Sequence, residues 1–232
     1  RQLALLEELC SFPLGRHIFY TKGANGYWTD YLVYAPLFEK ALKKEANSIE
    51  TFLKYRSPHV CAQRELFQTF VKTTNKLLKD DMVIASVPCG MMRDLFSLDL
   101  SMVEDVHLVG IDIDAEVLQN VQEKATQKNI NAVSLYQKDA WNLDMPEAFD
   151  LINSIGLNVY EQDHVQVINL YKQLHKSLKS GGVLFTGVLT YPPTHTKKGD
   201  WILSGMSQED ILLEKILHKD ILDINWQNFR HL

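Results

Sequence analysis

The chain has 232 residues, of which 46% are hydrophobic and 23% charged, and its formal net charge is −5 at pH 7. These values suit a globular protein with one domain of α/β size, alone or with a small appendage. A negative surface does not attract phosphate backbones, so nucleic acid is not expected as a substrate. The longest apolar run, at residues 183–189, is too short to cross a bilayer, so no membrane segment is expected.

The cysteine pattern bears on metal binding and on the cellular compartment. Cys10, Cys61 and Cys89 are far apart and form no CxxC pair. This spacing supports neither a disulfide framework nor a zinc site, and it favours a reducing, cytoplasmic environment. Because the chain starts at Arg1 rather than Met, we also expect it to be a piece of a longer product.

The first 80 residues have a helical pattern. A short helix is predicted at residues 3–9, residues 31–55 are predicted to be helical, and a further helix is predicted to begin at Pro58 and to end near Lys79. We expect residues 1–80 to form an N-terminal helical cap or lid, and residues 81–232 to form the main domain.

An aromatic cluster lies inside this region, next to an Asn-Gly turn signal. It comprises Tyr20, Tyr27, Trp28, Tyr31 and Tyr34, with Gly23 and Gly26 between its members. Two interpretations stay open. The aromatic residues pack helices together, or they form a lid that closes over a ligand and flexes at the two glycines.

Beyond residue 81 the pattern changes to alternating strands and helices. Strands are predicted at residues 82–87, 107–112, 132–137, 149–154 and 183–189. Asp114 and Asp163 are placed to cap two intervening helices, the second of which is expected to close at Gly181-Gly182. Strands joined by helices predict an α/β fold with a doubly wound, mostly parallel sheet. A last helix is expected at 207–219, after which too few residues remain for two further strands, and the oligomeric state stays open.

The first predicted strand leads into a tight turn. Met82 to Val87 is followed by Pro88-Cys89-Gly90, and Arg93-Asp94-Leu-Phe resembles the start of a helix. Such a glycine turn brings backbone close to a ligand, and free N–H groups at a helix start favour negative charge.

Polar residues also follow the other strands, and ligands of open parallel sheets lie beyond the carboxyl ends of the strands. Asp112 ends the second strand, where an acid can accept both hydroxyls of a ribose. Asp139 and Ala140 follow the third, where a carboxylate and a backbone N–H can read adenine. Asn153 ends the fourth, beneath the expected reacting end of the ligand.

The motifs resemble, in order and spacing, those of class I S-adenosylmethionine-dependent methyltransferases. They are the Gly90 turn, Gly-Ile-Asp112, Gln-Lys-Asp139-Ala140, Phe-Asp150-Leu-Ile-Asn153 and Leu-Lys-Ser-Gly181-Gly182. The resemblance covers roughly residues 82–190. It implies a Rossmann-like methyltransferase fold, S-adenosylmethionine as cofactor and S-adenosylhomocysteine as product. The cofactor-binding residues that it implies are Ser86, Pro88, Cys89, Gly90, Asp112, Ile113, Asp139, Ala140 and Asn153.

The chain departs from the family at the first turn, which usually reads acid-x-Gly-x-Gly-x-Gly. The corresponding positions here are Ser86, Pro88, Gly90 and Met92, so the acid and two glycines are missing. Pro88 has no N–H, and Met92 is expected to narrow the turn. We hypothesise that Arg93 lies near the carboxylate of the cofactor and that Asp94 lies near its ammonium.

The resemblance predicts methyl transfer to an unidentified, small-molecule acceptor by in-line displacement. A base is needed only if the nucleophile must lose a proton, and Tyr27, Tyr160, Tyr191 and His195 are candidates between which the sequence does not choose. Two alternatives are a non-catalytic protein that binds S-adenosylmethionine or S-adenosylhomocysteine, and an NAD-dependent oxidoreductase. The second would require G-x-G-x-x-G at the first turn, which is absent.

Simpler interpretations stand beside these roles. Asp112 could be a helix-capping acid, Asp139 an ordinary turn residue, Cys89 a small filler and His195 a solvated loop residue.

Overall fold

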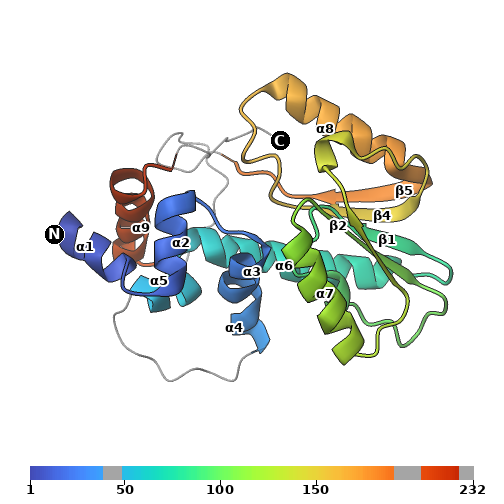
Figure 1. Ribbon diagram of the computed structural model, residues 1–232, viewed down its shortest axis with the longest axis horizontal. Coiled ribbons are helices and arrows are strands. Elements are labelled where there is room, and N and C mark those ends of the chain that lie inside the picture. The colour runs from blue at the N-terminus through green and yellow to red at the C-terminus, as the bar shows by residue number, and fades with distance from the viewer. Residues whose placement is uncertain (39–48, 191–204, 225–232) are drawn as a thin grey trace. The chain divides into compact units, whose positions relative to one another are not determined.

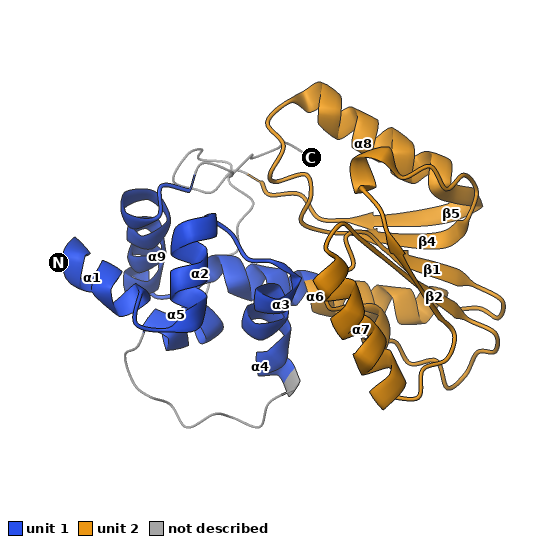
Figure 2. Ribbon diagram, in the orientation of Figure 1, with its two compact units in different colours: residues 1–66, 200–225 blue, residues 67–199, 226–232 orange. Residues whose placement is uncertain are grey.

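The computed structural model describes residues 1–38, 49–190 and 205–224 (Figure 1). It separates into two compact units (Figure 2). The helical unit lies within Arg1–Leu66 and Asp200–Asn225, and the sheet unit within Phe67–Gly199 and Trp226–Leu232. This division differs from the predicted one at residue 80, because the boundary falls inside a long helix and the C-terminal helix belongs to the helical unit.

Short helices build the helical unit. They are α1 (Gln2–Leu9), α2 (Pro13–Thr21), α3 (Gly26–Thr29), η1 (Asp30–Tyr34), α4 (Ala35–Phe38), α5 (Ile49–Tyr55), the start of α6 (Pro58–Leu77), α9 (Gln208–Lys215) and η4 (Ile216–Ile221). The predicted helices at 3–9 and from Pro58 are therefore confirmed. The helix expected over 31–55 is divided among η1, α4 and α5, and residues 39–48 lie outside the described part of the chain.

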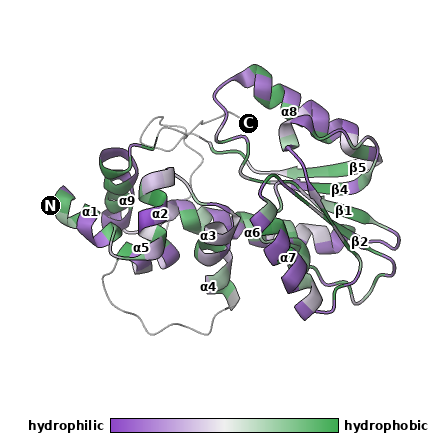
Figure 3. Ribbon diagram, viewed as in Figure 1, coloured by the Kyte–Doolittle hydropathy of each residue, from purple (hydrophilic) through white to green (hydrophobic). Residues whose placement is uncertain are grey.

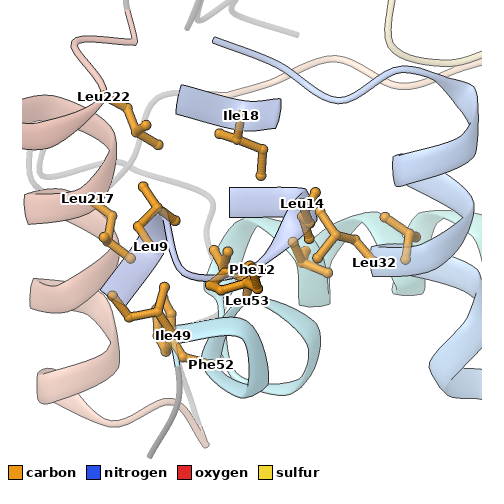
Figure 4. Close-up of a cluster of buried hydrophobic side chains, with 12 residues drawn as sticks. Leu9, Phe12, Leu14, Ile18, Leu32, Ile49, Phe52, Leu53, Leu217 and Leu222 are labelled. Atoms are coloured by element: carbon orange, nitrogen blue, oxygen red, sulfur yellow. The ribbon is translucent and has the colours of Figure 1, made fainter. Parts of the chain in front are cut away.

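A buried apolar cluster holds these helices together (Figure 4). It joins Leu9 of α1, Leu14 of α2, Phe52 of α5 and Leu217 of η4, which explains why the C-terminal helix belongs to this unit. Among the aromatic residues, Trp28, Tyr31 and Tyr34 pack against the same cluster, so helix packing accounts for them. The other two members, Tyr20 and Tyr27, are exposed.

Five parallel strands form the sheet, in the order β3-β2-β1-β4-β5. The strands are β1 (Val83–Ser86), β2 (His107–Asp112), β3 (Val133–Gln137), β4 (Phe149–Ser154) and β5 (Leu178–Thr186). The predicted α/β fold with a mostly parallel, Rossmann-like sheet is confirmed.

Helices cover both faces of this sheet. Successive side chains of a strand point to opposite faces, so strands with consecutive apolar residues present apolar surface on both. One face packs Ile84, Leu108 and Leu151 against α6 and α7 (Ala115–Gln127). The other packs Ala85, Val109 and Ile152 against α8 (His164–Ser177). The strands are mostly hydrophobic, whereas α7 and α8 carry many hydrophilic residues, as expected for amphipathic helices on a sheet (Figure 3).

Both predicted helix caps are present. Asp114 accepts hydrogen bonds from the backbone N–H groups of Glu116 and Val117, at 3.0 and 3.3 Å. Asp163 accepts one from Val165 at 2.8 Å. These carboxylates satisfy N–H groups that a helix start leaves unpaired, and so they fix where α7 and α8 begin.

Two sequence predictions about helix ends are wrong. The helix expected from Arg93 is replaced by a single 3-10 turn at Leu95–Ser97, because Asp94 lies inside the protein and the chain is extended at Leu98. The helix before Gly181-Gly182 ends earlier, at Ser177. The chain becomes extended at Leu178, which pairs with Phe149, and the glycines lie in an irregular stretch of β5.

No helix among the described residues combines the length and apolarity needed to cross a membrane.

Candidate functional site at the carboxyl ends of the strands

The register of the sheet brings the predicted site residues to one edge. Ser86 of β1 pairs with Asn153 of β4, and Asp112 of β2 pairs with Gln137 of β3. The backbone N–H of Lys138 also donates to the carbonyl of Asp112, at 3.0 Å. Asp139, the next residue, therefore follows the end of β3 beside the end of β2.

Asp112 is tied to the first turn. Its Oδ2 accepts from the backbone N–H of Gly90 at 2.9 Å, and its Oδ1 accepts from Asp114 at 3.1 Å. The N–H of Cys89 donates to the carbonyl of Ile111 at 2.8 Å. A carboxylate offers about four acceptor directions, so these bonds orient Asp112 and leave capacity for hydroxyl donors. The helix cap is Asp114, so the capping interpretation of Asp112 does not hold.

The end of β3 combines a carboxylate with a small apolar surface. Asp139 is exposed, and its Oδ1 accepts from the N–H of Trp141 at 3.0 Å, so it is also a turn residue. Ala140 is buried, whereas Ile113, which follows Asp112, is 69% exposed. An exposed isoleucine beside two acidic strand ends leaves apolar area available for a planar ring.

The first turn has two residues in the left-handed backbone region, of which only one is glycine. Gly90 has φ of +46° and Met92 has φ of +53°, so Met92 takes a conformation that usually requires glycine. The prediction that Met92 narrows the turn is wrong, because its side chain is fully buried in the core of the sheet unit. Pro88, which has no N–H, is partly buried and follows a cis peptide bond.

Space for this inward packing comes from Gly110, in the middle of β2. A Cβ at Gly110 would lie 3.1 Å from the sulfur of Met92, 3.2 Å from that of Cys89 and 2.7 Å from Leu135. A glycine inside a strand pattern often marks such a close approach, and this signal was available in the sequence but was missed. Cys89 is buried, and burial together with Asp112 and Asp94 raises its thiol pKa, so it is a filler rather than a nucleophile.

Asp94 lies at the ends of β1 and β4. Its Oδ2 accepts from Ser86 Oγ at 2.8 Å and from the side-chain amide of Asn153. Asp94 is 6% exposed, Asn153 5% and Ser86 3%, so this trio, the Asp94 network, is excluded from water. Ser86 occupies the position of the family's missing acid, and the carboxylate of Asp94 lies directly against it.

The Asp94 network is not fully satisfied. Asp94 Oδ1 and Asn153 Oδ1 are both buried without a hydrogen-bond partner among the described residues. Burial raises the pKa of Asp94, and the hydrogen bonds from Asn153 and Ser86 and the backbone N–H groups of Leu95 and Asp94 lower it. Two unpaired acceptors at adjacent strand ends are unusual, because each costs about 1–3 kcal/mol when it has no donor.

The two base candidates that lie among the described residues belong to different units. Tyr27 is 51% exposed on α3, in the helical unit, and Tyr160 is 52% exposed after β4, in the sheet unit. Partial desolvation raises the pKa of Tyr160, so its phenol stays protonated at neutral pH. His195 and Tyr191 lie outside the described residues. Arg93 is partly buried beside Asp94 in the chain.

The loop after β4 is fastened by a residue that sequence reasoning missed. Asn158 is buried, and its amide donates to Tyr171 of α8 at 2.7 Å and to the carbonyl of Gly187 at 2.8 Å. No periodicity or turn signal in the sequence distinguishes this asparagine. It holds the loop that borders the Asp94 network against α8 and the end of β5.

Two further features lie away from this site. A cavity of about 570 Å³ is bordered by Pro146, Lys176, Lys179 and Gly182, at the amino ends of β4 and β5 and so at the opposite edge of the sheet. Within residues 1–38, 49–190 and 205–224, no three His, Cys, Asp or Glu side chains are grouped as a metal site.

Comparison with known proteins follows the same part of the chain. A family model described as "Methyltransferase domain" matches residues 78–211, more than half of the chain. A crystal structure of a possible exported protein from Bordetella parapertussis is 35% identical, with a TM-score of 0.91, over 100% of this chain and 76% of that one. No curated protein matches the chain.

Other solved structures are more distant. The YcgJ protein from Bacillus subtilis is 18% identical over 57% of this chain and 55% of its own, with a TM-score of 0.47. PKMT2 from Rickettsia typhi, solved in complex with AdoHcy, is 20% identical over 50% of this chain and 22% of its own, with a TM-score of 0.44.

Proposed function

Since this chain belongs to the methyltransferase-domain family, we propose that it transfers a methyl group from S-adenosylmethionine to a small-molecule acceptor by in-line displacement. The observation that supports this most is the placement of Asp112 and Asp139. They follow neighbouring strands at the carboxyl edge of the sheet, and Asp112 is bound to the turn at Gly90.

The adenosine half of the cofactor fits the ends of β2 and β3. Asp112, already held by two backbone N–H groups, accepts the two ribose hydroxyls. Asp139 accepts from the exocyclic amine of adenine while the N–H of Ala140 donates to the ring. Ile113, which is largely exposed, packs on the ring face. The planar base thus covers apolar surface that water otherwise solvates.

The amino-acid half fits the first turn. Gly90 brings backbone close to the ligand, while Pro88 and Cys89 shape the turn around it. Arg93 lies three residues beyond Gly90 and supplies a guanidinium for the carboxylate, which it can bind through two parallel hydrogen bonds.

Catalysis on this site is chiefly a matter of alignment. When bound, S-adenosylmethionine supplies a methyl group that its sulfonium already activates. The protein holds the acceptor lone pair in line behind that carbon and excludes water. Fixing the two reacting groups in this geometry can remove a large part of the entropic barrier. Tyr160, neutral at pH 7, orients a hydroxyl or amine acceptor without removing its proton.

The acceptor is proposed to be a small molecule because the net charge of −5 disfavours nucleic acid. After β4 the chain reads Asn153-Ser-Ile-Gly, and not the Asn/Asp-Pro-Pro-aromatic sequence expected of an adenine methylase.

Three free cysteines favour a reducing, cytoplasmic location. Fractionation of cells that express the tagged full-length protein tests the location, and recovery outside the cytoplasm contradicts it.

Calorimetry and a transfer assay test the function. Titration with S-adenosylhomocysteine should give saturable binding, and titration with NAD should give none. Methyl-labelled S-adenosylmethionine should then label the small-molecule fraction of a cell extract. Failure to bind either adenosyl compound overturns the proposal. Binding without transfer to any fraction supports the non-catalytic alternative instead.

A further inference from the structure

We infer that Asp94 and Asn153 together form the receptor for the α-ammonium group of the cofactor, replacing the acid that is missing at Ser86. This inference rests on the proposed function and deepens it, because it assigns one functional group of the ligand to two side chains of the Asp94 network. It gives the hypothesis that Asp94 lies near this ammonium a structural basis, although Asp94 is eight positions beyond the strand end where the family places its acid.

The position of the carboxylate is the first observation. Ser86 and Asn153 pair across β1 and β4, and both hydrogen-bond to Asp94 Oδ2. The carboxylate is therefore held at the ends of these two strands, although its own backbone lies in the turn. Position 86 lacks the acid of the family pattern, but a carboxyl group still lies at the ends of β1 and β4.

The second observation is the pair of unpaired acceptors. Asp94 Oδ1 and Asn153 Oδ1 are buried and have no donor within the described chain. The three N–H donors of an ammonium can satisfy both atoms at once, whereas a carboxylate or a second acceptor cannot. A carboxylate buried beside a bound cation also recovers the attraction that it loses by leaving water.

The raised pKa of Asp94 agrees with a role in binding a cation. Burial is the largest influence on this pKa and raises it. Among the described residues, Cys89 lies close enough for the carboxylates of Asp94 and Asp112 to raise its thiol pKa, and neither Cys89 nor Asp112 supplies a positive charge. Arriving ammonium would favour the ionised carboxylate.

The test compares four ligands that differ only in the tail. They are S-adenosylhomocysteine, S-(3-carboxypropyl)-5′-thioadenosine, which lacks the amino group, S-(3-aminopropyl)-5′-thioadenosine, which lacks the carboxylate, and 5′-methylthioadenosine, which lacks both. Calorimetry on the full chain should show that removing the amino group weakens wild-type binding about tenfold to a hundredfold, the size of a charge-assisted hydrogen bond.

Asp94→Asn keeps the shape of the side chain and removes its charge. It should lose most of the preference for ligands that carry the amino group, and it should bind the carboxypropyl compound within about threefold of wild type. Asp112→Asn, the matched control, should weaken all four ligands by a similar factor, because each contains the ribose. Where Asp94→Asn does not fold, Asn153→Ala should reduce the same preference.

The inference is overturned if wild type binds the compounds with and without the amino group equally. It is also overturned if Asp94→Asn weakens all four ligands alike. In either case the wild type still binds 5′-methylthioadenosine and the proposed function survives. If wild type binds none of the four, the proposed function itself fails.

Discussion

Each unit of this protein buries a carboxyl group, and the two groups differ in how completely they are satisfied. In the helical unit, Glu214 of α9 accepts hydrogen bonds from Ser57 Oγ and from the backbone N–H of His59, at the start of α6. In the sheet unit, Asp94 uses only Oδ2, and its Oδ1 has no hydrogen-bond partner in the part of the chain described. Burial raises the pKa of both groups.

The difference separates a structural role from a binding role. Glu214 accepts from Ser57 Oγ and from the His59 N–H, which the start of α6 would otherwise leave without an acceptor, so its burial is explained by the fold alone. Asp94 and Asn153 each leave one buried acceptor oxygen without a donor among the described residues. These unpaired acceptors destabilise the folded state, so the fold alone does not explain them. We therefore expect substitutions at Glu214 to change stability and those at Asp94 to change ligand binding.

The largest expected effect concerns Glu214. Glu214→Ala should lower the free energy of unfolding by about 3–4 kcal/mol, because a buried hydroxyl and a buried N–H lose their acceptor. Glu214→Gln retains one acceptor oxygen and should cost less than half as much. Urea denaturation of both variants measures the two values. An equal loss in both would show that charge, rather than acceptor geometry, is what α6 requires.

The packing of Met92 against Gly110 gives the next effect. Met92→Ala should destabilise the protein by about 3 kcal/mol through the cavity it leaves. Gly110→Ala alone should cost about 1 kcal/mol or more from crowding. The double variant should be more stable than the sum of the two by roughly 0.5 kcal/mol, since removing the methionine sulfur relieves one contact of the new Cβ while the contact with Leu135 remains.

Met91→Ala is the matched control, since that neighbouring side chain is only partly buried and has ordinary backbone angles. We expect a change within about 1 kcal/mol. Strict additivity in the Met92 and Gly110 cycle would contradict the close approach.

The pH dependence of stability is expected to depend on two histidines of the helical unit, His59 and His218. Burial lowers the pKa of both His59 and His218 to about 4, and His59 contributes to the shift at His218. The unfolded chain takes up these protons near pH 6.5, so the stabilising effect is complete above pH 6.5 and is lost as pH falls towards 4. Raised-pKa carboxyls such as Glu214 and Asp94 act in the opposite direction.

Both residues are partly rather than fully buried, so we expect a net loss of about 2 kcal/mol between pH 7 and pH 5. Thermal unfolding at the two pH values measures it. His59→Gln and His218→Gln should each reduce the difference. An unchanged pH dependence in both variants would assign the loss to other groups.

The smallest effect is expected at Asp112. Asp112→Asn should weaken S-adenosylhomocysteine binding about tenfold, because a neutral amide accepts ribose hydroxyls less strongly than a carboxylate. Asp114→Asn is the matched control two positions away, where asparagine caps α7 as well as aspartate does. Calorimetry should show unchanged affinity for the control. Equal weakening in both variants would mean that the end of β2 responds to net charge alone.

The features predictable from sequence were those with a local physical cause. Apolar stretches of strand length located β2 and β4 to the residue, and Asp114 and Asp163 located the starts of their helices. The rule that parallel strands present their carboxyl ends together placed Asp112 beside the end of β3. Departures arose where distant residues decide the outcome. The helix after Arg93 does not form, since Asp94 is drawn to Ser86 and Asn153.

The sequence by itself thus determined the parallel sheet, the polar residues at its carboxyl edge and the family to which they belong. Each of these follows from periodicity, from capping chemistry or from the spacing of short motifs. Only the tertiary structure decided that the Met92 side chain packs into the core beside Gly110. It also decided that the carboxyl group of Asp94 lies at the ends of β1 and β4. Both depend on which side chains meet across β1, β2 and β4, and that meeting is set by the register of the sheet rather than by any local pattern.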